Sequence, residues 1–204
     1  MVEAQLRRRG IRDERVLRAM REIPREEFVP AELRVLAYRD EPIHIGYGQT
    51  ISQPYMTALM AEVLELEGTE TVLEVGSGCG YAAAVLGALA TRVVTVEILP
   101  GLVGVARANL RRTGRDWNVA VVQGDGSVGY PEGAPYDAIS VAAGAPEVPP
   151  QLLQQLSDPG RLTIPVGDFE NQDLLVVWRR GERIERRSAT QCRFVPLRGG
   201  EGWN

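Results

Sequence analysis

Three glycines follow a short apolar run near the middle of the chain, in the segment VLEVGSGCGY (residues 72–81). Glycine lets a backbone turn tightly and approach a ligand closely. A strand that runs into such a turn and then into a helix is typical of nucleotide-binding α/β folds. Gly76, Gly78 and Gly80 therefore predict a cofactor-binding loop, although a simple tight turn would explain the same glycines.

Two acidic residues follow the next two predicted strands. Glu97 ends the second strand, where a carboxylate can accept hydrogen bonds from both ribose hydroxyls of a nucleotide. Asp125, followed by Gly126, comes after the third strand and could accept from an adenine amino group or merely stabilise its own turn. Because these motifs fall at successive strand ends, together they indicate a nucleotide site far more strongly than any one alone.

The residue at position 81 helps to identify the nucleotide cofactor that this loop binds. A dinucleotide fingerprint, G-x-G-x-x-G, needs a small third glycine where the pyrophosphate meets the helix. Here the spacing is G-x-G-x-G and the bulky Tyr81 occupies that place. This favours S-adenosylmethionine, which carries no phosphate, and disfavours a nicotinamide-dependent dehydrogenase.

A second polar cluster, IGYGQTISQPYM, spans residues 45–56. Ser52 could be no more than the N-cap of a helix that begins near Pro54. That interpretation leaves Gln49, Thr50 and two glycines unexplained. We therefore expect this loop to form a polar wall over a ligand.

The elements that position these residues can be predicted from short apolar patterns. β-Branched runs predict strands at Val72–Val75, Val93–Val96, Val119–Val122, Ala138–Val141, Leu162–Val166 and Leu174–Trp178. Helical patterns between the early strands include Tyr81–Ala90 and Leu102–Leu110. The alternation predicts a doubly wound α/β fold with a mostly parallel sheet. Turns rather than helices separate the last strands, which predicts an antiparallel edge.

The first 53 residues differ in pattern from the rest. Asp13 is a plausible N-cap for a helix from Glu14 to Glu22, and Asp40 to Gln53 is expected to be a long loop. The helix after this loop should bury a face made of Tyr55, Leu59, Met60, Val63 and Leu64. We expect one domain over residues 1–204, with N-terminal helices and loop in 1–53 and the α/β core in 54–204.

Composition narrows the class of protein. The 204 residues carry a net charge of −4, with arginine but no lysine. Arginines cluster at Arg7–Arg9 and, among acidic residues, at Arg183–Arg187, but no pattern concentrates positive charge on one face, which argues against a nucleic-acid partner. Two cysteines and one histidine are too few for the usual zinc sites, so no metal is expected. No apolar run approaches the ~20 residues that span a membrane, and no signal-peptide pattern is visible. We expect a cytoplasmic protein without a membrane partner.

Several motifs occur in the order in which one enzyme family has them. GYGQTISQPYM, VLEVGSGCGY, the GDG turn, PYDAISVAAGAPEVP, LTIPVG and the terminal FVPLRGGEGW together resemble the protein-L-isoaspartate O-methyltransferases, from about Arg12 onward. The resemblance implies a seven-stranded, Rossmann-like methyltransferase sheet. It also implies methyl transfer from S-adenosylmethionine to the free α-carboxylate of L-isoaspartyl residues in damaged proteins, with S-adenosylhomocysteine as the other product. The ester would then initiate repair through a succinimide.

The same match implies roles for individual residues. Ser52 stands at the family's active-site serine, Glu97 at the ribose ligand, and Asp125 with Gly126 beside the adenine. The expected cofactor-binding set is Gln49, Thr50, Ile51, Ser52, Glu74, Gly76, Ser77, Gly78, Gly80, Glu97, Ile98, Asp125 and Gly126. Two departures from the family pattern, Gly144 within an alanine run and Cys79 in place of a hydroxyl residue, are small.

The expected chemistry needs few catalytic groups. An isoaspartyl α-carboxylate has a pKa of about 3.5 by analogy with chain termini, so it is ionised at neutral pH and needs no general base. We expect Ser52 to donate a hydrogen bond to this carboxylate. We also expect the protein to act as a monomer. The alternatives are a methyltransferase of another acceptor and a nucleotide-binding module without turnover.

Overall fold

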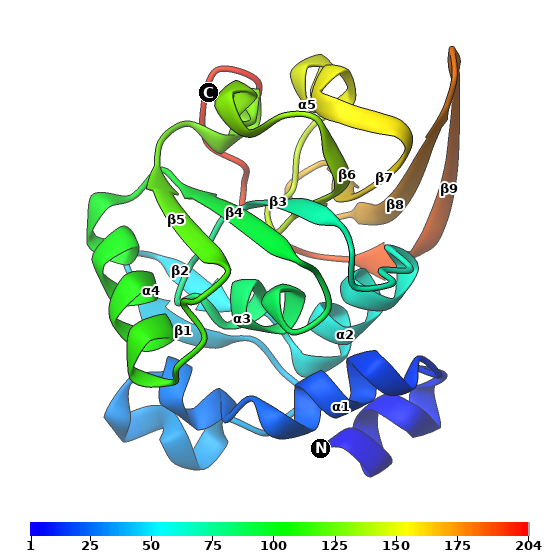
Figure 1. Ribbon diagram of the computed structural model, residues 1–204. Coiled ribbons are helices and arrows are strands. Elements are labelled where there is room, and N and C mark those ends of the chain that lie inside the picture. The colour runs from blue at the N-terminus through cyan, green and yellow to red at the C-terminus, as the bar shows by residue number, and fades with distance from the viewer. Residues whose placement is uncertain (204) are drawn as a thin grey trace.

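The computed structural model describes residues 1–203, and Asn204, the last residue of the expected domain, lies outside the described residues. A seven-stranded sheet in the order β5-β4-β3-β6-β7-β8-β9 forms its centre (Figure 1). The strands are β3 (Thr71–Val75), β4 (Arg92–Glu97), β5 (Val119–Gln123), β6 (Tyr136–Val141), β7 (Leu156–Gly167), β8 (Gln172–Arg180) and β9 (Arg183–Cys192). The first five pair in parallel, and β8 and β9 add antiparallel edge strands. The predicted architecture is confirmed.

Helices cover both faces of the sheet. The α-helices are α1 (Glu14–Glu22), α2 (Pro54–Val63), α3 (Tyr81–Gly87), α4 (Pro100–Arg112) and α5 (Pro150–Gln155). Side chains of α1 to α4 share one core with alternate strand residues such as Val72 and Val93. Leu73 and Val94 face the other way and pack with α5. Figure 1 shows α5 alone above the sheet and the other α-helices below it.

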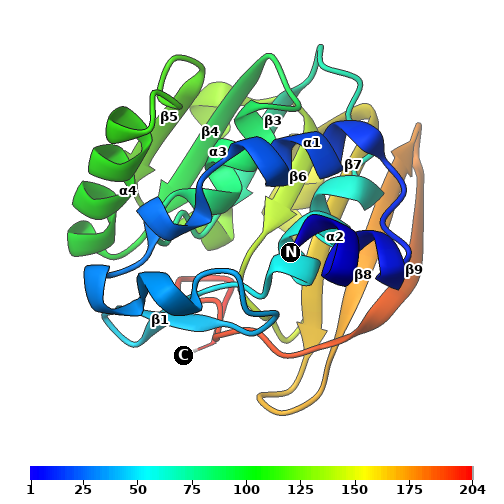
Figure 2. The same cartoon turned by 90° about the horizontal axis from the view of Figure 1, so that it is seen from below.

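The N-terminal residues form a layer of short helical segments that lies beneath α2 and α3 in Figure 1 and faces the viewer in Figure 2. These are η1 (Val2–Leu6), η2 (Arg7–Arg9), α1, η3 (Arg25–Phe28) and η4 (Ala31–Leu36). The Asp13 carboxylate accepts from the backbone N–H groups of Arg15 and Val16, so the predicted N-cap is confirmed. Val16, Leu17 and Met20, which form the apolar stripe of α1, are buried.

Three details differ from the sequence-based predictions. The expected loop from Asp40 to Gln53 contains a small hairpin of β1 (Ile43–Gly46) and β2 (Gln49–Ile51). Helix α2 lies between layers and buries most of its surface, so the predicted face was too narrow: Ala58 and Ala61 are buried, whereas Tyr55 and Val63 are only half-buried. The apolar runs indicated six strands and missed β9, because that edge strand exposes both faces over its first six residues.

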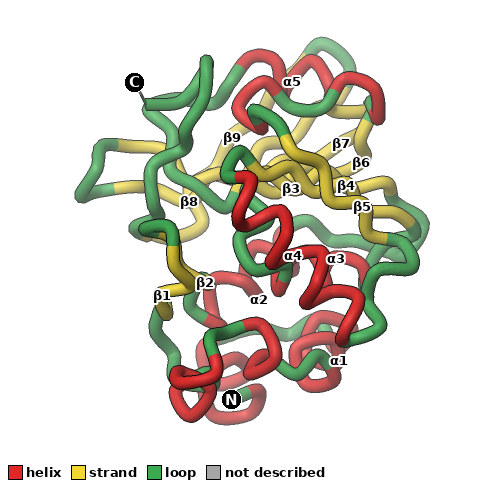
Figure 3. Tube along the Cα trace, turned by 90° about the vertical axis from the view of Figure 1, so that its left-hand side faces the viewer, coloured by secondary structure: helices red, strands yellow, loops and turns green. Residues whose placement is uncertain are grey.

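The strand order reverses direction at the centre of the sheet. From β3 the chain continues outward to β4 and β5 on one side, and later to β6 and β7 on the other. Ligands of open α/β sheets bind at the carboxyl ends of the strands where this reversal occurs. Figures 2 and 3 place the β1–β2 hairpin and the C-terminal segment together at one such edge. Of the helices formed by residues 1–203, none has the length and hydropathy needed to cross a membrane.

Candidate active site

The predicted glycine loop connects β3 to α3. Gly76, Gly78 and Gly80 have φ values of 93°, 51° and 88°, a region that side chains with a Cβ rarely adopt. At Gly80 an added Cβ would lie 3.3 Å from the Ala106 Cα atom of α4. Gly80 therefore permits the close approach of α3 and α4. It faces α4.

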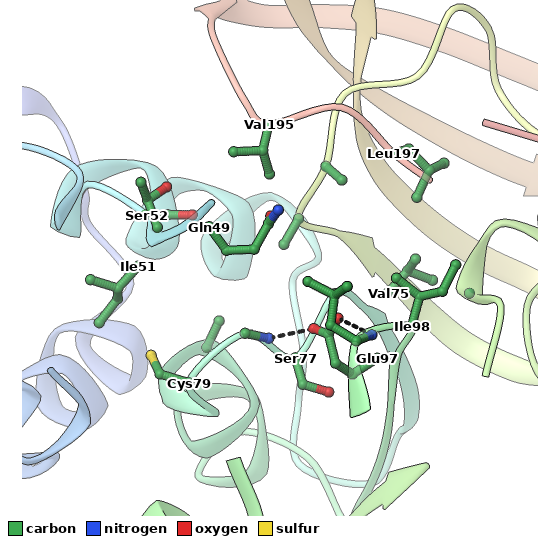
Figure 4. Close-up of a pocket in the computed structure, with 18 of the residues that line it drawn as sticks. Gln49, Ile51, Ser52, Val75, Ser77, Cys79, Glu97, Ile98, Val195 and Leu197 are labelled. Atoms are coloured by element: carbon green, nitrogen blue, oxygen red, sulfur yellow. Dashed lines mark hydrogen bonds between the residues drawn. The ribbon is translucent and has the colours of Figure 1, made fainter. Parts of the chain in front are cut away.

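A cavity opens at the carboxyl ends of β3 and β4 and encloses about 790 Å³, part of it open to solvent. Segments far apart in the chain meet around it (Figure 4). Its lining comprises Gln49, Thr50, Ile51, Ser52, Thr57, Val75, Gly76, Ser77, Gly78, Cys79, Tyr81, Ala82, Val96, Glu97, Ile98, Leu99, Gly126, Ala142, Ala143, Val195, Pro196, Leu197 and Arg198. All but three members of the predicted cofactor-binding set are thus brought together. The three that do not line the cavity are Glu74, Gly80 and Asp125.

Glu97 is held in place by the backbone of the loop. One carboxylate oxygen accepts from the Gly78 N–H at 2.9 Å and the other from the Leu99 N–H at 3.0 Å (Figure 4). The side chain is buried at the cavity wall. Each carboxylate oxygen can accept further hydrogen bonds, so the pair can receive a diol without moving.

Glu74 lies beneath the loop and is completely buried. Its carboxyl accepts a 2.5 Å hydrogen bond from the Thr95 hydroxyl, which in turn contacts the Ser77 hydroxyl at 2.6 Å. Burial, with a smaller contribution from the charge of Glu97, raises the pKa of Glu74 to about 8. Glu74 is therefore an uncharged support of the loop at neutral pH, and the expected direct contact with the cofactor is not what the structure shows.

Asp125 also has a different place from the one expected. Oδ1 accepts from the N–H and hydroxyl of Ser127, and Oδ2 accepts from the Gly200 N–H. Partial burial alone would raise the pKa of Asp125, but these hydrogen bonds together outweigh it and lower the pKa below its usual value. These bonds stabilise the turn after β5 and tie it to the C-terminal segment, and the contact of Asp125 with an adenine stays a prediction. Gly126, the next residue, does line the cavity.

Ser52 lies between β2 and α2. The N-cap of α2 is Gln53, and no side chain makes a capping hydrogen bond there. Capping therefore does not explain this serine. The side chain lies on the cavity lining opposite Glu97, close to Gln49 (Figure 4).

A second cavity of about 650 Å³ adjoins the first, and Thr50, Ser52, Ala142 and Val195 line both. Its other lining residues come from η2, the start of α2 and the end of β9: Arg9, Pro42, Gln53, Tyr55, Met56, Thr190, Gln191, Cys192, Arg193 and Phe194. Ser52 thus stands where two adjacent spaces meet. Such a pair of spaces can hold two reactants side by side.

The C-terminal segment Val195–Arg198 was not among the predicted site residues. It crosses the cavity and is anchored to Gly144, whose N–H donates to the Val195 carbonyl and whose carbonyl accepts from the Leu197 N–H, both at 2.8 Å. The Trp203 indole also donates to the Gly144 carbonyl. The motif FVPLRGGEGW contains this segment, but no local sequence pattern indicates its contact with Gly144, about 50 positions earlier in the chain.

Cys79 and His44, whose side chains could in principle take part in a reaction, contribute little chemistry here. Burial raises the pKa of the Cys79 thiol to about 11, so this cysteine is protonated and a poor nucleophile. His44 is exposed on β1 and lines neither cavity.

Comparisons with known proteins agree with this geometry. The family model described as protein-L-isoaspartate(D-aspartate) O-methyltransferase matches residues 1–202. Protein-L-isoaspartate O-methyltransferase 2 of Marinobacter nauticus is 55% identical over 205 residues, covering 100% of this chain and 93% of the relative. The Methanoculleus marisnigri protein-L-isoaspartate O-methyltransferase is 53% identical, with 100% and 92% coverage.

Solved structures show the same likeness. One protein-L-isoaspartate O-methyltransferase superposes with a TM-score of 0.84 at 32% identity, covering 98% of this chain and 67% of the other. A Plasmodium falciparum protein, described as a beta-aspartate methyltransferase in complex with S-adenosyl-L-homocysteine, has a TM-score of 0.80 at 28% identity, with 97% and 96% coverage.

Proposed function

The chain belongs to the protein-L-isoaspartate(D-aspartate) O-methyltransferase family, and from this premise we propose how its residues divide the work of the reaction. The protein transfers a methyl group from S-adenosylmethionine to the free α-carboxylate of L-isoaspartyl residues in damaged proteins and peptides, and so initiates their repair through a succinimide. Neither of the two alternatives, methyl transfer to a different acceptor and a nucleotide-binding module without turnover, is favoured.

The first cavity suits S-adenosylmethionine by its charges and shape. Among the described lining residues only Glu97 and Arg198 carry charge, so there is no cluster of cations of the kind that binds a pyrophosphate. When bound, this cofactor supplies an electrophilic methyl group on a positively charged sulfur. Glu97 accepts from the ribose hydroxyls, and the backbone of Gly76 to Gly78 faces the amino-acid end. The half-exposed Ile98 and the buried Gly126 flank the adenine.

The rest of the proposed cofactor set follows from the lining. Gln49, Thr50, Ile51 and Ser52 close the cavity from the hairpin side, and Ser77 contributes a hydroxyl from the loop. Glu74, Gly80 and Asp125 act one layer further out: they support the loop, the helix packing and the C-terminal segment.

Ser52 is the proposed catalytic residue, and its place between the two cavities is the observation that carries the proposal. The acceptor carboxylate enters from the second cavity and is already ionised, so no group needs to remove a proton. The Ser52 hydroxyl donates a hydrogen bond to one oxygen and leaves the other free to face the methyl group. Such alignment can lower a barrier by as much as ~7–11 kcal/mol in favourable cases.

Methyl transfer to matched peptides tests the acceptor. Labelled S-adenosylmethionine is offered with one peptide containing L-isoaspartate and one containing normal aspartate. Base-labile label on the isoaspartyl peptide alone is expected. Label on the aspartyl peptide, or on neither while the cofactor binds, would overturn the acceptor assignment.

The substitution Ser52→Ala tests the role of the serine. Loss of one hydrogen bond to a charged group, worth ~1.5–3 kcal/mol, should lower kcat/KM for the isoaspartyl peptide about 10- to 100-fold. The dissociation constant of S-adenosylmethionine, measured by calorimetry, should change little. Ser157→Ala is the matched control, because that hydroxyl bonds to Asp137 and Pro159 at the start of β7, away from both cavities. Full turnover by Ser52→Ala would remove the serine from the mechanism.

We further propose a single domain that acts as a monomer in the cytoplasm without a nucleic-acid partner. Leu17 and Ile51 pack in the same core as Val72, which supports one domain. Both cysteines are free thiols, which agrees with a reducing compartment. The net charge of −4 disfavours nucleic acid. Light scattering tests the monomer, and cell fractionation tests the compartment.

A further inference from the structure

Arg25, the first residue of η3, is a completely buried cation. No ion pair formed by residues 1–203 includes it. Asp40, a carboxylate that acts on it at longer range, pairs with Arg9 at 2.5 Å and accepts from the Tyr55 N–H. Burying a charge without a counter-ion is costly, so a guanidinium in this position calls for a reason.

The contacts of Arg25 point to the loop that carries Ser52. Its Nη2 donates to the main-chain carbonyl of Ser52 at 2.6 Å, and its Nε donates to the Ala37 carbonyl at 2.7 Å. Among the described residues Nη1 has no hydrogen-bond partner. One side chain thus ties the N-terminal layer to the residue where the two cavities meet.

Arg25 also lies directly behind the cavity wall. The guanidinium carbon is 4.9 Å from the centre of the Tyr81 ring, and Tyr81 lines the cofactor cavity. Burial lowers the pKa of Arg25 below its usual value, and neighbouring Tyr81 and Cys79 oppose that change. An arginine nevertheless stays charged in a protein. A fixed positive charge therefore stands behind the wall of the cofactor cavity, next to the main chain of Ser52.

The geometry suits arginine and no other side chain. A guanidinium donates from fixed, planar N–H groups, so it can hold two carbonyls at set directions. A lysine ammonium at the same position keeps the charge but lacks the planar fork. The substitution Arg25→Lys therefore tests the planar geometry of the donor groups while it keeps the positive charge.

We propose that Arg25 is a positioning residue for methyl transfer, which fixes Ser52 through its main-chain carbonyl. This inference rests on the proposed role of Ser52. It adds a residue from the N-terminal layer that touches neither reactant. It also explains why a protein would retain a buried guanidinium without a carboxylate partner.

A double-mutant cycle tests the proposal. Arg25→Lys, Arg25→Met, Ser52→Ala and the double variant Arg25→Lys/Ser52→Ala are compared for kcat and KM with an isoaspartyl peptide. Cofactor affinity is measured by calorimetry. Arg25→Lys should lower kcat about tenfold or more, because a small displacement of an aligning group slows a reaction strongly. It should leave the cofactor affinity within about twofold, since Arg25 lines neither cavity.

The cycle distinguishes positioning from general support of the fold. In the Ser52→Ala background, Arg25→Lys should lower kcat by less than about a further twofold, because the hydroxyl that Arg25 positions is gone. Arg34→Lys is the matched control: Arg34 lies in the same layer and forms an exposed ion pair with Glu27. It should behave as the wild type.

Each remaining outcome contradicts the positioning role of Arg25 or the catalytic role of Ser52. If Ser52→Ala is slow while Arg25→Lys turns over at the wild-type rate, the inference fails and the role of Ser52 stands. Equal tenfold losses in both backgrounds, or failure of both Arg25 variants to fold, would make Arg25 a structural residue and also overturn the inference. Full activity of Ser52→Ala would instead remove the proposed function of the serine, and the positioning role with it.

Discussion

At the scale of single residues, two glutamates near the cavity have opposite surroundings. Glu97 receives two backbone N–H groups at the cavity wall, whereas Glu74 is sealed below the loop with one hydroxyl donor and one unpartnered oxygen among the described residues. Sealing a carboxyl from water disfavours its charged form. Position near a strand end thus does not determine the role of a glutamate, and the raised pKa of Glu74 follows mainly from its burial.

The pKa of Glu74, raised from 4.5 to about 8, predicts a pH-dependent stability. The unfolded chain releases this proton near pH 4.5 but the folded chain keeps it, so the stabilising contribution is complete below pH 4.5 and is lost as the pH rises towards 8. Glu74→Gln removes the titration. Its free energy of unfolding relative to the wild type should therefore rise across this window by up to ~1.4 kcal/mol per pH unit.

Urea unfolding of both proteins at several pH values between 5 and 8 measures this difference. Glu70→Gln is a useful contrast, because hydrogen bonds from backbone N–H groups lower the pKa of that partly buried carboxyl despite burial. A constant difference between Glu74→Gln and the wild type would mean that Glu74 is charged in the folded protein.

At the scale of elements, the packing of α3 against α4 depends on Gly80. Its φ of 88° and its 3.3 Å approach to Ala106 both exclude a side chain. Gly80→Ala should lower the free energy of unfolding by about 1–3 kcal/mol. Thermal or urea unfolding measures the loss.

Gly104 in α4 is the matched control. It is exposed, and an added Cβ would meet nothing within 4 Å. Gly104→Ala should therefore stabilise the protein by about 0.5–1 kcal/mol through better helix propensity. Similar effects of the two substitutions would contradict the packing role of Gly80.

The same elements show what could be predicted from the sequence and what could not. The turn formed by the three glycines, the Asp13 cap and the buried strands follow from local patterns, and the structure has them. The burial of Glu74 could not be predicted, because a residue near a strand end can face the core as well as a ligand. The charged strand β9 lacks the alternation that identifies strands, so only the family resemblance indicated a seventh strand. The closing segment Val195–Arg198 depends on contacts with Gly144, which no local pattern reveals.

At the scale of the whole molecule, the cavity is completed by parts from both ends of the chain. The β1–β2 hairpin closes one side and Val195–Arg198 closes the other, with Asp125 tying the latter to the turn after β5. Asp125→Asn should weaken the binding of S-adenosylmethionine about tenfold although Asp125 does not line the cavity, because loss of the tie to Gly200 loosens the segment. Calorimetry measures the affinity.

A chain shortened to end at Arg198 provides the control for this prediction. It lacks Gly200, so Asp125→Asn should have little additional effect in it. An undiminished tenfold loss in the shortened chain would show that Asp125 contacts the cofactor directly, as the family match suggested.

The late position of Val195–Arg198 in the chain has a consequence for synthesis. A ribosome makes the glycine loop, Glu97 and Ser52 well before it makes this segment, and every strand of the sheet precedes it. Domains can begin to fold while they are being made. The sheet can therefore assemble on the ribosome, but its cofactor site stays open on one side until residues 195–198 emerge. A nascent chain of this protein should accordingly gain tight cofactor binding only after Arg198 has left the ribosome.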